Sequence, residues 1–92
     1  MYEILIPNPI DKWINKHLNN ELIKRLDKKI RKLEFAPDVY GKPLRGQMAG
    51  VWEIYFERRY RVLYEIDYPN ERVYIIGIKH KDELTKIKSS LL

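Results

Sequence analysis

The chain has 92 residues, enough for one small core, so we expect residues 1–92 to form a single domain. It contains no Cys, which excludes disulfides and thiolate chemistry and favours an intracellular compartment. Its 18 Lys and Arg residues against 13 Asp and Glu residues give a net charge of +5. This charge favours an anionic partner such as nucleic acid, although solubility alone explains it equally well. No stretch has the length of a membrane span and residues 1–7 do not resemble a signal peptide, so we expect a cytoplasmic protein without membrane contact.

The first half of the sequence predicts a strand and two helices. Residues 2–6 are rich in strand-forming types and end at Pro7. Asn8 is expected to cap a helix that has Pro9 at its first position. A second helix begins near Glu21. Apolar residues recur at helical spacing in both helices: Ile10, Trp13, Ile14, His17 and Leu18 in the first, and Leu22, Ile23, Leu26, Ile30 and Leu33 in the second.

The opposite face of the second helix is almost wholly charged, with a run of basic residues from Lys24 to Lys32. Such a face is typical of a solvated helix, and it is also a candidate surface for binding nucleic acid.

The second half predicts strands. Residues 38–50 are rich in Gly and Pro and are expected to form a functional loop. Residues 51–57 and 60–66 alternate with a period of two and predict a hairpin. Val73 to Lys79 is apolar on both faces, which indicates a central strand that is covered on both sides. Asp82 is expected to cap a short last helix.

The resulting order is βααβββα, an α+β fold. We expect the helical hairpin to pack on one face of a mainly antiparallel four-stranded sheet, with the other face partly open and a short C-terminal helix at the end.

Several kinds of chemistry lack support in the sequence. The two histidines, His17 and His80, lie on different elements without neighbouring metal ligands, so we expect no metal site. The glycines do not have the spacing of a phosphate-binding loop, so no nucleotide cofactor is expected. The serines near the C-terminus have no activating base beside them in the pattern.

Cations concentrate instead around the predicted sheet. They lie in the connection, at the hairpin tip, on the strand after it and where the last strand ends: Lys42, Arg45, Arg58, Arg59, Arg61, Lys79, His80 and Lys81. Arg61 is expected to point away from the apolar side chains of its strand, either toward a ligand or into an ion pair with Glu53 or Glu65. His80 is a candidate for proton transfer or simply a polar surface residue.

Such a set suits cleavage of RNA without a metal ion. The RNA supplies its own nucleophile, the 2′-hydroxyl, so the protein has to position it and neutralise the phosphate. A general acid and base add about 10²- to 10⁴-fold.

The sequence resembles the RelE/ParE toxin superfamily, in its RelE-like branch. The resemblance spans nearly the whole chain and rests on four segments: Lys42-Pro43-Leu44-Arg45-Gly46, Gly50-Val51-Trp52-Glu53-Ile54, Tyr60-Arg61-Val62-Leu63-Tyr64-Glu65-Ile66 and Ile76-Gly77-Ile78-Lys79-His80-Lys81.

This resemblance implies the toxin of a type II toxin-antitoxin pair, an endoribonuclease that cuts messenger RNA in the ribosomal A site. It implies silencing by a RelB-like antitoxin, through which the complex binds operator DNA. The family's RNA-contacting or catalytic positions carry over to Arg45, Arg61 and Lys81. The strand lysines of the family correspond here to Glu53 and Tyr55, which are hypothesised to supply proton transfer or stacking, and its C-terminal tyrosine corresponds to Thr85.

Two other functions stay open on these residues. One is a ParE-like toxin that poisons DNA gyrase, and the other is a weakened toxin that acts only by binding its antitoxin. We expect the antitoxin to contact apolar residues of the last helix, Leu84, Ile87 and Leu91, unless that helix packs on its own sheet.

Overall fold

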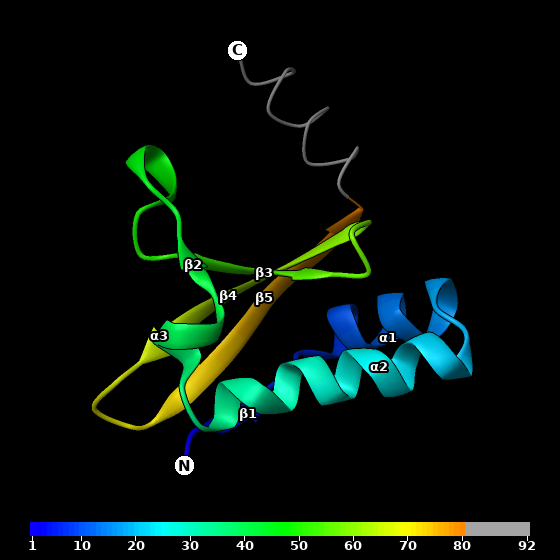
Figure 1. Cartoon of the computed structure of the whole chain (residues 1–92), viewed down its shortest axis with the longest axis horizontal. Helices are drawn as coiled ribbons and strands as arrows, with labels where there is room; N and C mark the ends of the chain where they lie inside the picture. The colour runs from blue at the N-terminus through cyan, green and yellow to red at the C-terminus, as the bar shows by residue number, and fades with distance from the viewer. Residues whose placement is uncertain (81–92) are drawn as a thin grey trace.

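A computed structural model describes residues 1–80, in which helices cover one face of a twisted sheet (Figure 1). The chain begins with strand β1, Glu3–Leu5, and continues into helices α1, Asn8–His17, and α2, Asn20–Arg31. A 3₁₀ turn, η1, follows at Lys32–Glu34, and then a one-turn helix, α3, at Pro37–Tyr40.

The remaining described elements belong mainly to the sheet. They are β2, Lys42–Pro43; a 3₁₀ turn, η2, Gly46–Met48; and β3, Trp52–Phe56; β4, Tyr60–Asp67; and β5, Arg72–His80. The strand order is β1-β5-β4-β3-β2, with β1 parallel to β5 and the other pairs antiparallel. None of the helices among residues 1–80 has the length and apolar character needed to cross a bilayer.

The α+β class and the open sheet face are confirmed, but the expectation of four strands is wrong. The fifth strand, β2, lies inside the segment that the sequence predicted as a loop. Two residues are too short to show a period, and Pro43 is tolerated because β2 is an edge strand. The expected last helix lies outside the described residues.

The two long helices differ in how their first turns are capped. Asn19 caps α2, because its side-chain oxygen accepts a hydrogen bond from the Leu22 N–H at 2.8 Å. The expectation that Asn8 caps α1 is wrong: the helix begins at Asn8 itself, with Pro7 as a cap that forms no side-chain hydrogen bond. His17 is exposed rather than buried, and its ring stacks on Trp13 at 4.4 Å.

The core lies between the helices and the sheet. Side chains from both layers are less than about a tenth exposed, and they include Ile14, Leu26, Leu33, Ile54, Val62, Tyr64 and Ile75. The apolar face predicted for α2 is therefore confirmed.

The far face of the sheet is open. β5 is an interior strand, but it alternates between buried and exposed residues, so the expectation that it is covered on both sides is wrong. Tyr74 and Ile76 are 37% and 41% exposed. In Figure 1 the loop between β2 and β3 also projects away from α1 and α2.

Candidate functional site

Four side chains on the open sheet face form the candidate site. They are Glu53 and Tyr55 from β3, Arg61 from β4 and Lys79 from β5, and we call them the open-face site. Arg61 is the cross-strand partner of both Tyr55 and Lys79. Since directly paired residues share one face of a sheet, these three side chains form a row across the three strands.

A bulge brings Lys79 into this row. Leu63 pairs with Gly77 while the next residue, Tyr64, pairs with Ile75, so Ile76 is an extra residue in β5. A β-bulge reverses the alternation of the strand that contains it. Without it, Lys79 would share the face of the buried residues Val73 and Ile75.

Arg61 is held on two sides. Its Nη2 donates a hydrogen bond to the Tyr55 hydroxyl at 3.0 Å, and its guanidinium carbon lies 5.1 Å from the centre of the Tyr55 ring. On the other side its Nη1 forms an ion pair with Glu53 Oε2 at 3.6 Å. The ion pair expected as one alternative for Arg61 thus exists, and its partner is Glu53 rather than Glu65.

Glu53 is the buried member of the site. Its side chain is 9% exposed, against 31% for Arg61. Its cross-strand partner in the edge strand β2 is Lys42, which is exposed, so a third cation lies on the open face in addition to Arg61 and Lys79. Lys42 therefore lies beside the site, and its role in RNA binding stays a prediction.

The hairpin tip places two further cations beside the row, where β3 ends and β4 begins. Arg58 and Arg59 are exposed in the turn between Phe56 and Tyr60, the pair of residues next to the Tyr55–Arg61 pair. Glu57 in the same turn forms an ion pair with Arg25 of α2 at 2.5 Å, and this hydrogen bond raises the pKa of Arg25.

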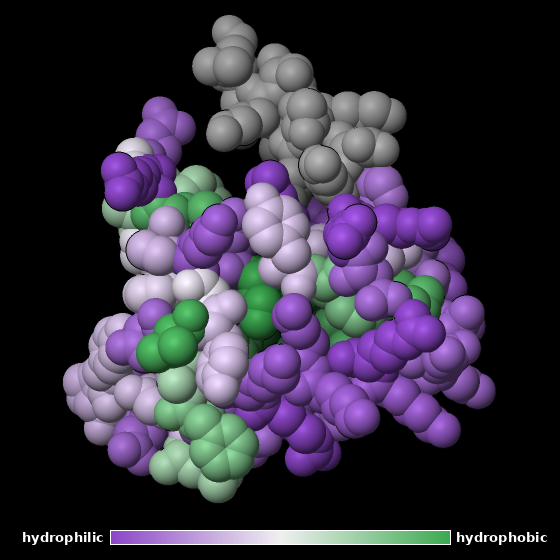
Figure 2. Space-filling view, in the orientation of Figure 1, coloured by the Kyte–Doolittle hydropathy of each residue, from purple (hydrophilic) through white to green (hydrophobic). Residues whose placement is uncertain are grey.

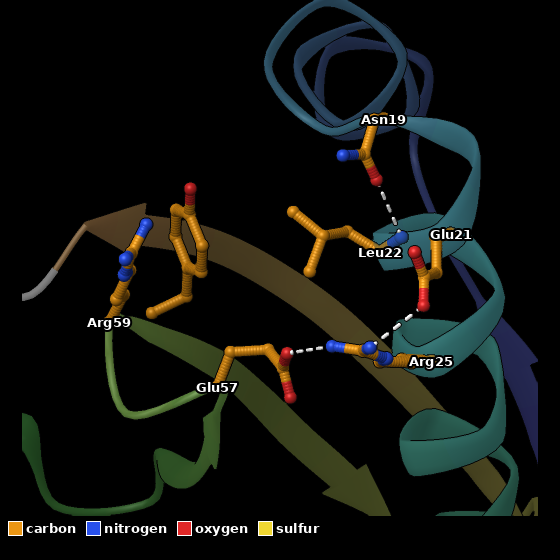
Figure 3. Close-up of a pocket in the computed structure, with 7 residues that line it drawn as sticks. Asn19, Glu21, Leu22, Arg25, Glu57 and Arg59 are labelled. Atoms are coloured by element: carbon orange, nitrogen blue, oxygen red, sulfur yellow. Dashed lines mark hydrogen bonds and ion pairs between the residues drawn. The ribbon is translucent and has the colours of Figure 1, made fainter.

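A cleft of about 340 Å³ lies between this turn and the start of α2 (Figure 3). Arg25 bridges Glu21 and Glu57 across it, and Arg59 lies at its far side. The paired carboxylates leave little uncompensated positive charge in this cleft, so the open face is the better candidate site.

Arg45 and His80, which the sequence also predicted as site residues, do not join the row. Arg45 is exposed on the loop just before η2, beyond the start of β3. His80 pairs with Tyr60 and meets its ring edge-on at 5.5 Å. It therefore lies on the face opposite Lys79, toward Trp13, whose ring also contacts Tyr60. Lys81 lies outside the described residues, as do Leu84, Ile87, Leu91 and Thr85.

Within residues 1–80, no three His, Asp or Glu side chains lie close enough together to hold a metal ion. The chemistry available in the described part of the chain is therefore that of a carboxylate, a phenol and several cations around a sheet face.

Comparison with known proteins assigns the chain to a family. Residues 9–85 match the family model described as the ParE toxin of the type II toxin-antitoxin system parDE. No curated protein matches the sequence.

Solved structures share the fold. The toxin-antitoxin complex RelBE2 from Mycobacterium tuberculosis is similar with a TM-score of 0.76 and 26% identity, over 87% of this chain and 98% of that one. The isolated RelE toxin of E. coli is similar with a TM-score of 0.71 and 19% identity, over the whole of both chains. The archaeal RelE-RelB complex from Pyrococcus horikoshii has a TM-score of 0.66 at 17% identity, over 87% and 94% of the two chains.

Proposed function

Since this chain belongs to the ParE toxin family of type II toxin-antitoxin systems, we propose that it is a toxin that cleaves messenger RNA on the ribosome. The observation that supports cleavage is the row of Tyr55, Arg61 and Lys79 across the open sheet face. Arginine, lysine and an aromatic ring together suit a single-stranded RNA backbone and its bases.

The row matches the demands of RNA cleavage through the 2′-hydroxyl. Negative charge builds up on the phosphate in the transition state, and fixed cations stabilise it most when they need no rearrangement. Arg61 is fixed by its hydrogen bond to Tyr55 and its ion pair with Glu53. The exposed ring of Tyr55 offers a surface on which a base can stack.

The antitoxin is the expected protein partner. The similar structure from M. tuberculosis is a toxin-antitoxin complex, and that from P. horikoshii is a complex of RelE with RelB. Here an apolar groove runs between the end of β1 and β5, lined by Leu5, Ile6, Pro7, Tyr74, Ile75 and Ile76. Apolar surface of this kind suits coverage by a RelB-like antitoxin, through which the complex would bind operator DNA.

Replacement of Arg61 tests the proposal. We expect Arg61→Ala to lower cleavage of ribosome-bound mRNA by about 10²-fold or more, because a preorganised charge on the phosphate is lost. Primer extension on mRNA from a purified translation system measures the rate.

The matched control is Arg72→Ala. Arg72 lies in β5, like Lys79, but it forms an ion pair with Glu3 at 3.4 Å and is well separated along the strand from Lys79. This variant should cleave ribosome-bound mRNA at the same rate as the parent protein. Undiminished cleavage by Arg61→Ala would remove Arg61 from the site and the proposal with it.

A gyrase-poisoning toxin is the second candidate. The match to the ParE family model favours it, as does the presence of Glu53 and Tyr55 at the strand positions where the RelE-like pattern has lysines. A supercoiling assay with the same purified protein separates the two: inhibited gyrase together with intact mRNA would establish the alternative.

A further inference from the structure

Two polar atoms on the open face are buried without a hydrogen-bond partner in residues 1–80. They are Oε2 of Glu53 and Nε of Arg61. Glu53 Oε2 and Arg61 Nη1 are 3.6 Å apart, which allows an ion pair but is too long for a hydrogen bond. The contact between Glu53 and Arg61 thus leaves one acceptor and one donor unused.

Unused hydrogen-bonding groups in buried positions are rare, because each has given up water without gaining a partner. When they occur at a site, a ligand that offers the complementary groups is a natural partner. Here the ligand has to donate to a carboxylate and, close by, accept from a guanidinium.

A ribonucleotide linkage carries this pair of groups. The 2′-hydroxyl is a donor, and the phosphate on the adjacent 3′-oxygen is an acceptor that binds guanidinium strongly. DNA has the phosphate but lacks the hydroxyl. The pair Glu53–Arg61 therefore matches RNA at the atoms that react.

We propose, on the premise that the protein cleaves RNA, that Glu53 is the catalytic base. Its carboxylate takes the proton of the 2′-hydroxyl while Arg61 holds the phosphate. The 2′-oxygen then forms a bond to phosphorus, the bond from phosphorus to the 5′-oxygen breaks, and that oxygen takes a proton from water. The products are a 2′,3′-cyclic phosphate and a 5′-hydroxyl.

Other groups near the row are less suited to this step. The Tyr55 hydroxyl already accepts a hydrogen bond from Arg61. Lys42 and Lys79 are cations, and His80 lies against Tyr60 on the other face. Among the described residues, Glu53 is thus the carboxylate that contacts the arginine of the row.

The variant Glu53→Gln tests the assignment, since it keeps the size of the side chain but cannot take the proton. We expect cleavage of ribosome-bound mRNA to fall by about 10²-fold or more. Binding of an RNA with a 2′-deoxy residue at the cut position should not weaken, because Arg61 still meets the phosphate. The control Glu65→Gln changes an exposed carboxylate on the same strand as Arg61 and should cleave like the parent.

The outcomes separate the two proposals. If the parent cleaves RNA and Glu53→Gln cleaves it equally well, Glu53 is not the base, while the proposed function stands. If the parent cleaves no RNA, both proposals are overturned. If Glu53→Gln loses binding as well as cleavage, Glu53→Asp decides: recovery of cleavage by this carboxylate supports the base, and failure to recover overturns it.

Discussion

Arg61 belongs both to the contacts that hold the sheet face together and to the candidate site. Its contacts with Glu53 and Tyr55 fix the guanidinium on the sheet face. A side chain held in this way loses little freedom when a phosphate binds, so more of the interaction is available to the transition state. Lys in its place would lack the planar fork that reaches several partners at once.

Tyr64 of β4 connects the sheet to the segment from α3 to the start of β2. It is fully buried, and its hydroxyl donates a hydrogen bond to the Pro37 carbonyl at 2.6 Å. It also packs against Gly41, where an added Cβ would lie 1.8 Å from the Tyr64 oxygen. Tyr64 thereby sets the path of the chain from α3 into β2.

We expect Tyr64→Phe to lower the free energy of unfolding by about 1–2 kcal/mol, because the buried Pro37 carbonyl loses its donor. Urea denaturation measures the change. Tyr68→Phe is the control, since Tyr68 is half exposed, and it should change stability by less than about 0.5 kcal/mol. Equal stability of Tyr64→Phe and the parent would show that this hydrogen bond does not hold the segment.

The same tyrosine implies a pH dependence. Burial raises the pKa of the Tyr64 phenol above its ordinary value of 10.0. A raised pKa in the folded state gives stability that is present below the unfolded pKa and lost as the pH rises above it. The stability difference between the parent and Tyr64→Phe should therefore shrink above a pH of about 10.

At the scale of elements, the β3–β4 hairpin has an unusual turn. Glu57 and Arg58 have φ angles of 53° and 59°, the left-handed region required at both central positions of a type I′ turn. Glycine or asparagine normally occupies such positions. The chain keeps two large charged residues there, one paired with Arg25 and the other exposed next to the site.

Arg58→Gly should therefore stabilise the fold by up to about 1 kcal/mol and at the same time weaken RNA binding, because a cation is lost. Urea denaturation and RNA titration measure the two effects. Arg59→Gly removes the same charge from a position without a positive φ, so it should lower stability. If both variants change stability in the same direction, the turn is not strained at Arg58.

Much of this architecture could be predicted from local patterns. Helical spacing identified the buried face of α2, and the alternation around residues 51–66 identified the hairpin. The strand β2 was not predicted because two residues, one of them a proline, are too few to show a period. The bulge at Ile76 was not predicted, because an extra residue disturbs the alternation of polar and apolar residues and this segment is too apolar to show that alternation.

The residues of the candidate site could be named from the sequence, but their alignment in one row could not be predicted. Arg61, Tyr55 and Lys79 were all candidates in the sequence, yet their alignment depends on strand register and on the bulge. The same register places His80 on the opposite face, where it contacts Tyr60. The joint action of Arg45, Lys81 and Arg61 on one RNA phosphate stays a prediction.

Over residues 1–80, the excess of basic over acidic residues lies in the helical layer and not in the sheet that carries the candidate site. Residues 8–34, which form α1, α2 and η1, contain twice as many basic as acidic residues, whereas the rest of residues 1–80 contains equal numbers of both. Figure 2 shows strongly hydrophilic side chains over the α2 side of the molecule. The net charge of residues 1–80 therefore comes from the helical layer, and the open face is distinguished by the placement of a few cations.

In the proposed reaction, this toxin cleaves RNA with the RNA's own 2′-hydroxyl as the nucleophile. The most direct measurement adds the purified protein to ribosomes that hold either an mRNA or the same mRNA with a single 2′-deoxy residue at the mapped cut. We expect cleavage of the first and none of the second at that position, since only the first carries the nucleophile. Cleavage of both at the same position, or of neither, would contradict the account.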